Sequence, residues 1–251
     1  MLIKEDVEIP YLRQKRKLHI FIPDDAKDGE RFPVFYMFDG HNLFLDEDAT
    51  YGKSWGLLKY FTENNIRTMI VGIECNHSGN KRLCEFSPYS FKDPEWGTVR
   101  ATGKKFLDWM TTDLKNYIDD RYPTLSDKEH TYLGGSSMGG LMSIYGGAIY
   151  SNIYSKSACL SPFTMFVLNR LIRDLDKLDD LSGSTFYISF GRFEFSTKKN
   201  LSHGIEENLA IMRSLTRKNA KCFMHLYEYG DHSEGSWEKE IPNFLSDLEI
   251  Y

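Results

Sequence analysis

Cysteine and long hydrophobic runs are both scarce in this chain of 251 residues. Its four cysteines show no C-x-x-C spacing, so neither a disulfide scaffold nor a cysteine-rich zinc site is indicated, and we expect all four to be reduced. No apolar run reaches the roughly 18 residues that a membrane span requires. Residues 1–6 lack the apolar run of a signal peptide. These absences predict a cytoplasmic protein with no membrane partner.

Positive charge is not in excess either, since the net charge is −5. The one basic cluster, residues 13–17, is expected on a solvated face of an early strand. A nucleic-acid partner would normally require a basic face, so none is expected. Repeats, low-complexity tracts and linkers are also missing, which predicts a single domain over residues 1–251. The sequence is compatible with a homo-oligomer but does not decide the oligomeric state.

What the chain does contain is an alternation of short apolar runs and amphipathic stretches. Strands are expected at residues 18–22, 34–38, 69–73, 131–133, 157–161, 185–190 and 221–227. Helices are expected at residues 55–61, 100–121, 140–145, 163–181 and 202–218, of which 163–181 could form a small cap. Such alternation predicts an α/β fold with a mostly parallel central sheet and helices on both faces.

Residues 135–139 read Gly-Ser-Ser-Met-Gly and match G-x-S-x-G, the pattern of a nucleophile elbow. Ser137 is the expected nucleophile, because a pattern centred on Ser136 would need glycine where Met138 stands. An apolar strand precedes the motif and an apolar helix follows it, as this turn requires. The alternative is a glycine- and serine-rich turn without chemistry.

A serine hydroxyl is a weak nucleophile at neutral pH and needs a general base. Three histidines follow Ser137 in the sequence. His203 falls on an expected helix and His225 within an expected strand, where surface and packing roles are ordinary. His232 lies in a polar loop just past the last strand, where functional groups of this fold gather. It is therefore the expected base.

The base in turn needs an acid that holds its tautomer and stabilises the imidazolium. Glu194 follows the strand at residues 185–190 and is the expected acid. Asp231 competes, but its position next to His232 makes contact with that ring difficult. Alternatively, Glu194 is a surface residue paired with Arg192 or with a nearby lysine.

The oxyanion of an acyl-transfer reaction needs two fixed N–H donors. The backbone N–H of Met138, directly after the nucleophile, is one candidate. The second should lie after the strand at residues 34–38, where the N–H groups of Gly40 and His41 both qualify. The alternative is a tight turn with Asn42 as the cap of the next helix.

Several segments together resemble the putative esterase family of α/β-hydrolases, which includes esterase D, feruloyl esterases, enterochelin-type esterases and mycolyltransferases. They are residues 36–44, 72–74, 82–88, 135–141, 161–162 and 230–237. His41 stands where glutamine is common in the family. The resemblance implies an α/β-hydrolase fold and a Ser-His-acid enzyme that hydrolyses a small-molecule ester, with Ser137 and His232 carried over. The acid stays open, because some siderophore esterases manage largely with a Ser-His pair.

The resemblance also implies that Arg82 and Glu85 lie near the mouth of the site. They could bind a polar or anionic substrate group or form a structural ion pair. Trp55 is a candidate for the substrate pocket, with the core as its alternative. The mechanism requires no cofactor or metal, and the spacing around His232 does not fit a metal site. Two other functions remain open: an acyltransferase with the same triad, and a binding protein without catalysis.

Overall fold

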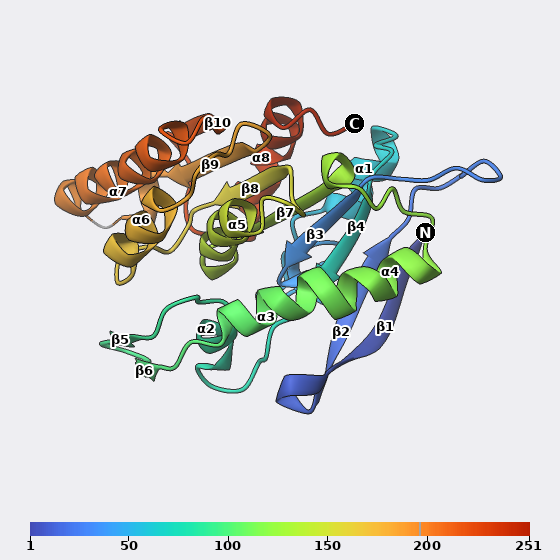
Figure 1. Cartoon of the computed structure of the whole chain (residues 1–251), viewed down its shortest axis with the longest axis horizontal. Coiled ribbons are helices and arrows are strands. Elements are labelled where there is room, and N and C mark those ends of the chain that lie inside the picture. Colours follow the sequence, from blue (N-terminus) through green and yellow to red (C-terminus); the bar gives the residue numbers. More distant parts are fainter. Residues whose placement is uncertain (196) are drawn as a thin grey trace.

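A computed structural model describes residues 1–195 and 197–251 of the chain. Its main element is an eight-stranded sheet in the order β1-β2-β4-β3-β7-β8-β9-β10 (Figure 1). The strands are β1 (Leu2–Ile9), β2 (Gln14–Phe21), β3 (Val34–Phe38), β4 (Met69–Ile73), β7 (Thr131–Ser136), β8 (Lys156–Leu160), β9 (Thr185–Gly191) and β10 (Lys221–Tyr227). The pairs from β4 through β10 are parallel, whereas β2 runs antiparallel to both β1 and β4. The expected mostly parallel sheet is thus confirmed.

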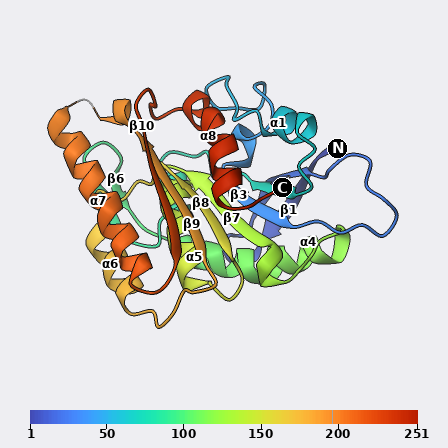
Figure 2. The ribbon, with the colours of Figure 1, turned by 90° about the horizontal axis from the view of Figure 1, so that it is seen from above.

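Helices cover both faces of the sheet (Figure 2). One face carries α1 (Leu57–Glu63) and α8 (Glu234–Asp247). The other carries α3 (Gly103–Trp109), α4 (Lys115–Arg121), α5 (Met138–Ile149), α6 (Leu168–Asp176) and α7 (Lys198–Thr216), with a π-helical turn between α3 and α4. The short helix α2 (Lys81–Glu85) and the hairpin of β5 (Phe91–Asp93) and β6 (Gly97–Val99) lie outside the sheet. Two hydrophobic cores result, one on each face.

The strand β3 shows why its sequence is apolar throughout. Tyr36 and Phe38 belong to the core under α3 and α5, whereas Phe35 and Met37 belong to the core under α1 and α8. Successive side chains point to opposite faces, so a strand covered on both sides needs apolar residues at every position. Burying each of these side chains contributes about 1.5–3 kcal/mol. The C-terminal end of β3 is thereby fixed beside β7, where the site is built.

Most of the expected elements are present, with some differences. The expected helix at residues 163–181 is shorter, because α6 begins only at Leu168. The expectation that residues 13–17 are all solvated is wrong for Arg16, which is buried. The strand β1 was not predicted, because charged residues alternate along it, and neither were α2, α8 and the β5–β6 hairpin. The four cysteines are free.

None of the helices in the described part of the chain combines the length and the apolar character needed to cross a membrane.

Candidate active site

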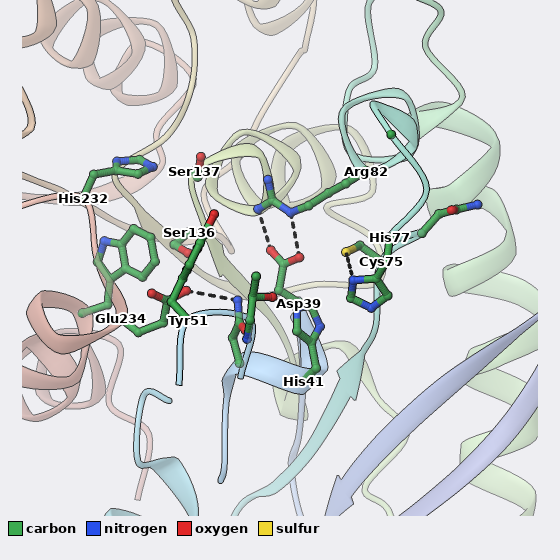
Figure 3. A pocket seen from close by; sticks show the side chains of 15 residues that line it. Asp39, His41, Tyr51, Cys75, His77, Arg82, Ser136, Ser137, His232 and Glu234 are labelled. Atoms are coloured by element: carbon green, nitrogen blue, oxygen red, sulfur yellow. Dashed lines mark hydrogen bonds and ion pairs between the residues drawn. The ribbon is translucent and has the colours of Figure 1, made fainter. Parts of the chain in front are cut away.

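Ser137 occupies a strained turn between β7 and α5. Its backbone has φ 58° and ψ −119°, a conformation that a residue with a side chain rarely adopts. The surrounding contacts explain the glycines of the motif. A Cβ atom on Gly135 would lie 3.1 Å from Cβ of Phe38, and one on Gly139 would lie 2.9 Å from the same atom. The Ser137 side chain borders a cavity at the C-terminal edge of the sheet (Figure 3).

His232 and Glu194 are joined by a hydrogen bond. The Nδ1 atom of His232 lies 2.8 Å from Oε2 of Glu194, whose side chain is only 8% exposed. The other carboxylate oxygen accepts from the hydroxyl of Ser161 at 2.7 Å and from the backbone N–H of Gly191 at 2.5 Å. The carboxylate is thus held by donors on both oxygens. An acceptor at Nδ1 places the proton of a neutral imidazole there and leaves Nε2 free to act as a base.

Ser137 and His232 both border the cavity (Figure 3). Within the described residues, the Ser137 hydroxyl forms no hydrogen bond with the His232 ring. Such bonds are often long or poorly aligned before substrate binds and tighten in the complex.

Trp237 of α8 contacts both His232 and Ser161, whose hydroxyl binds Glu194. Its indole N–H donates to the hydroxyl of Ser161 at 2.8 Å, and its ring packs edge-on against His232 with centroids 5.2 Å apart. Asp231, the competing acid, instead accepts from the hydroxyl of Ser236 at 2.6 Å. The supporting role of Ser161 was missed in the sequence. Its only signal was a Ser-Pro pair directly after a strand.

The candidate oxyanion donors lie on two turns at the edge of the sheet. Gly40 begins a 3₁₀ turn (Gly40–Asn42), where an added Cβ would lie 2.5 Å from the backbone of Gly72. Among the described residues, the backbone N–H groups of Gly40, His41 and Met138 donate to no protein acceptor. No protein acceptor among the described residues therefore occupies them. Asn42 does not cap α1: its side-chain amide donates to Glu234 at 3.1 Å.

Arg82 borders the cavity and forms a two-point ion pair with Asp39. Its Nε and one terminal nitrogen lie 2.8 Å and 2.7 Å from the two carboxylate oxygens. Burial alone would raise the pKa of Asp39, but the charge and hydrogen bonds of Arg82 outweigh it and hold that pKa below its usual value. Much of the charge of Arg82 is consequently balanced before any substrate arrives.

Glu85 and Trp55 do not border this cavity. Glu85 is buried, forms an ion pair with Arg16 and accepts from the backbone N–H of Asn76 at 2.9 Å. Burial raises the pKa of this carboxyl group. Trp55 is buried and packs against Trp237, with ring centroids 5.7 Å apart. Arg82 and Glu85 therefore pair with other residues and not with each other.

Two cavities meet at His232. The first, of about 440 Å³, has polar walls that include Asp39, Arg82 and Glu234. The second, of about 330 Å³, lies on the side of Glu194. Its walls combine apolar side chains, among them Phe163, Met165, Phe190 and Phe195, with polar ones such as Asn200, Glu207 and Asn208. Residues 163–165 belong to the segment expected as a cap, and they form a wall of the second cavity.

The family described as "Putative esterase" matches residues 9–248 of the chain. The protein belongs to this family. Family membership supports a hydrolase of the esterase type, with a small-molecule ester as its substrate. The α/β-hydrolase resemblance drawn from the sequence is confirmed by this match.

Individual relatives of this esterase-family protein are distant. An uncharacterized protein of Bacillus subtilis (strain 168), YjcH, is 21% identical over 244 residues, which cover 94% of this chain and 92% of YjcH. An IroE-like serine hydrolase from Shewanella oneidensis has a similar structure, with a TM-score of 0.79, 18% identity and coverage of 99% and 80% of the two chains. A ferulic acid esterase gives a TM-score of 0.71 at 16% identity, covering 100% and 99%. At these identities the structural likeness shows the shared fold.

One further group of the esterase-family site escaped sequence analysis. His41, Cys75 and His77 lie together in the wall of the polar cavity. Burial lowers the pKa of His41 and raises the pKa of the Cys75 thiol. No sequence pattern indicated that His41 and Cys75 lie together, because more than thirty residues separate them.

Proposed function

We propose that this protein is a serine carboxylic-ester hydrolase in which Ser137, His232 and Glu194 form the catalytic triad. The observation that carries the proposal is the 2.8 Å contact between His232 and the buried carboxylate of Glu194. It lies on the same cavity as a serine in the strained turn of a nucleophile elbow. A base with a fixed tautomer that shares a cavity with the serine fits the arrangement that acyl transfer requires.

The proposed reaction has two steps. Nε2 of His232 takes the proton of Ser137 as the serine oxygen attacks the ester carbonyl carbon. The N–H of Met138 and that of Gly40 or His41 bind the resulting oxyanion, an interaction whose loss typically costs about 3–4 kcal/mol in barrier. The intermediate then expels the alcohol, which receives the proton from His232. Water, deprotonated by the same histidine, attacks the acyl-enzyme and releases the acid and free Ser137.

Hydrolysis is favoured over transfer to an alcohol by the exposure of the base. The His232 side chain is 43% exposed, so water reaches the position from which it would attack the acyl-enzyme. A dedicated acyltransferase would need to exclude that water.

The two cavities suggest how an ester would be held. The cavity beside Glu194, with the aromatic rings of Phe163, Phe190 and Phe195, suits an aromatic or short aliphatic group on one side of the scissile bond. The polar cavity with Arg82, Asp39 and Glu234 suits a hydrogen-bonding group on the other side. Because the positive charge of Arg82 is balanced by Asp39, we propose a polar, uncharged group there.

The decisive experiment is intact-mass analysis after exposure to a fluorophosphonate. We expect one adduct on the native protein and on Ser136→Ala, and none on Ser137→Ala. Ser136 is the matched control, because it is the neighbouring serine on the same cavity. Hydrolysis of p-nitrophenyl acetate should be lost in parallel with the adduct. A folded native sample without an adduct, or an adduct that persists in Ser137→Ala, would overturn the proposal.

A further inference from the structure

Three side chains with metal-binding atoms converge on one wall of the polar cavity. His41 comes from the 3₁₀ turn after β3, and Cys75 and His77 come from the loop after β4. Their ligand atoms all lie within 4.8 Å of one another. Figure 3 shows this group on the far side of the Arg82–Asp39 pair from Ser137 and His232. The group is therefore separate from the proposed triad, although it faces the same cavity.

The Nε2 atom of each of the two histidine rings lies near another polar side chain. Nε2 of His41 contacts the hydroxyl of Thr50 at 3.0 Å, and Nε2 of His77 lies 3.5 Å from a carboxylate oxygen of Glu74. In metal sites a ligating histidine nearly always uses its second ring nitrogen in this way, and a carboxylate is a common partner. The Nδ1 atom of each ring is left for another role.

The Nδ1 atoms of both rings are candidates for an ion. His41 is 94% buried, since only 6% of its surface is exposed, and its Nδ1 has no hydrogen-bond partner among the described residues. A buried polar atom without a partner is rare and calls for a physical reason. Nδ1 of His77 lies 3.9 Å from Sγ of Cys75. An ion between the three side chains would bind the unpartnered nitrogen of His41 as well.

One of the three ligand pairs, Cys75 and His77, has a spacing near that of a tetrahedral zinc site. With Zn–S and Zn–N bonds of the usual length, the sulfur and nitrogen ligands lie about 3.6 Å apart. The observed 3.9 Å between Cys75 and His77 is only slightly longer. The His77 side chain is 55% exposed, so a small rotation of its ring would bring it to the ion without disturbing the core.

We propose that Nδ1 of His41, Sγ of Cys75 and Nδ1 of His77 bind one Zn²⁺ ion, with a water molecule in the fourth position. One thiolate and two imidazoles suit zinc, which accepts sulfur and nitrogen ligands in tetrahedral geometry. Binding replaces the thiol proton of Cys75, which is released to solvent. The site joins the turn that carries Gly40 and His41 to the loop after β4, and its open position faces the cavity. This inference goes beyond the proposed ester hydrolysis and does not depend on it.

The test is direct binding to the full chain. Native protein stripped with a chelator is dialysed against Zn²⁺, and the bound metal is counted by mass spectrometry after removal of the excess. Co²⁺ replaces Zn²⁺ in a parallel titration, because a thiolate ligand gives a charge-transfer absorption that reports the Cys75–metal bond. The variants are Cys75→Ser and His77→Asn. Matched controls are Cys84→Ser, a cysteine outside the group, and His203→Asn, an exposed histidine on α7.

We expect one Zn²⁺ per chain in the native protein and in both controls. Each of the two variants should lower the affinity by more than about 100-fold, since loss of a mere outer-shell partner already costs about 10- to 100-fold. Cys75→Ser should also lose the cobalt charge-transfer band. His77 is exposed, so His77→Asn should keep its native circular dichroism spectrum. No binding to the native protein, or equal binding to His77→Asn, would overturn the proposal, and neither result would bear on the esterase proposal.

Discussion

Replacing Glu194 by glutamine should remove most of the activity and leave the protein folded. One oxygen of Glu194 faces two donors, the hydroxyl of Ser161 and the backbone N–H of Gly191. The hydroxyl of Ser161 donates here because a carboxylate oxygen can only accept, and the backbone N–H of Gly191 is a fixed donor. A glutamine will therefore place its carbonyl oxygen against these donors. The reverse orientation would leave a buried N–H unsatisfied, at a cost of about 1–3 kcal/mol.

The side-chain NH₂ group of the glutamine would then stand 2.8 Å from Nδ1 of His232, where the carboxylate oxygen stood. Because an NH₂ group only donates, Nδ1 must become the acceptor and the ring proton must move to Nε2. The histidine can then no longer take the proton of Ser137. In a Ser-His-Asp protease, the corresponding change leaves the geometry intact and lowers kcat about 10⁴-fold. We expect a similar loss here, equivalent to about 5.4 kcal/mol in barrier.

The assay is kcat for p-nitrophenyl acetate at neutral pH, with thermal unfolding measured on the same samples. Glu206→Gln is the matched control, because Glu206 is an exposed glutamate on α7, away from the triad. The control should keep native kcat. If Glu194→Gln keeps its native Tm and loses less than tenfold in kcat, then Glu194 is not the triad acid. The orienting role would have to pass to another acid or be absent, as in a Ser-His pair.

Three further predictions concern stability. Gly139→Ala should lower the free energy of unfolding by about 1–3 kcal/mol, because its Cβ would lie 2.9 Å from Cβ of Phe38. Gly235→Ala is the control and should leave the stability unchanged, because the nearest atom to its Cβ would be 3.9 Å away. Equal melting temperatures for the two variants would refute the packing argument. Arg82→Gln should cost about 3 kcal/mol at neutral pH by leaving Asp39 buried and unpaired. The pKa of Asp39 is held below its ordinary value, so its contribution to stability is lost as the pH falls through that lowered pKa. In denaturant titrations the gap between native and Arg82→Gln should therefore close in acid, and a constant gap would contradict this. Burial raises the pKa of Glu240 from 4.5 to about 7, so its charged form destabilises the fold increasingly as the pH rises between those values. Glu240→Gln should stabilise the protein by up to about 3 kcal/mol above neutral pH and have little effect in acid. Thermal unfolding of the native protein and the variant at both pH values checks this.

Features that depend on neighbours in the sequence could be predicted without the structure. The elbow is local: glycines at positions 135 and 139 and the strand–turn–helix order set the backbone at Ser137. Continuous apolar runs predict strands that are buried on both faces, as β3 and β4 are. The loop of His232 follows the last strand directly and ends where Ser233 caps α8. The strand β1 was not predicted because its exposed face carries charged residues.

Features that depend on contacts between distant segments were decided only by the tertiary structure. The sequence left Glu194 and Asp231 as rival acids, and the fold places Glu194, 38 residues away, against His232. It likewise brings Trp237 to Ser161 across 76 residues, and Glu85 to Arg16 across 69. No local pattern encodes such pairs, because they form only when separate strands align at one edge of the sheet. The same reason hid the group of His41, Cys75 and His77: two adjacent parallel strands, β3 and β4, end side by side and deliver the three side chains to one wall of the cavity.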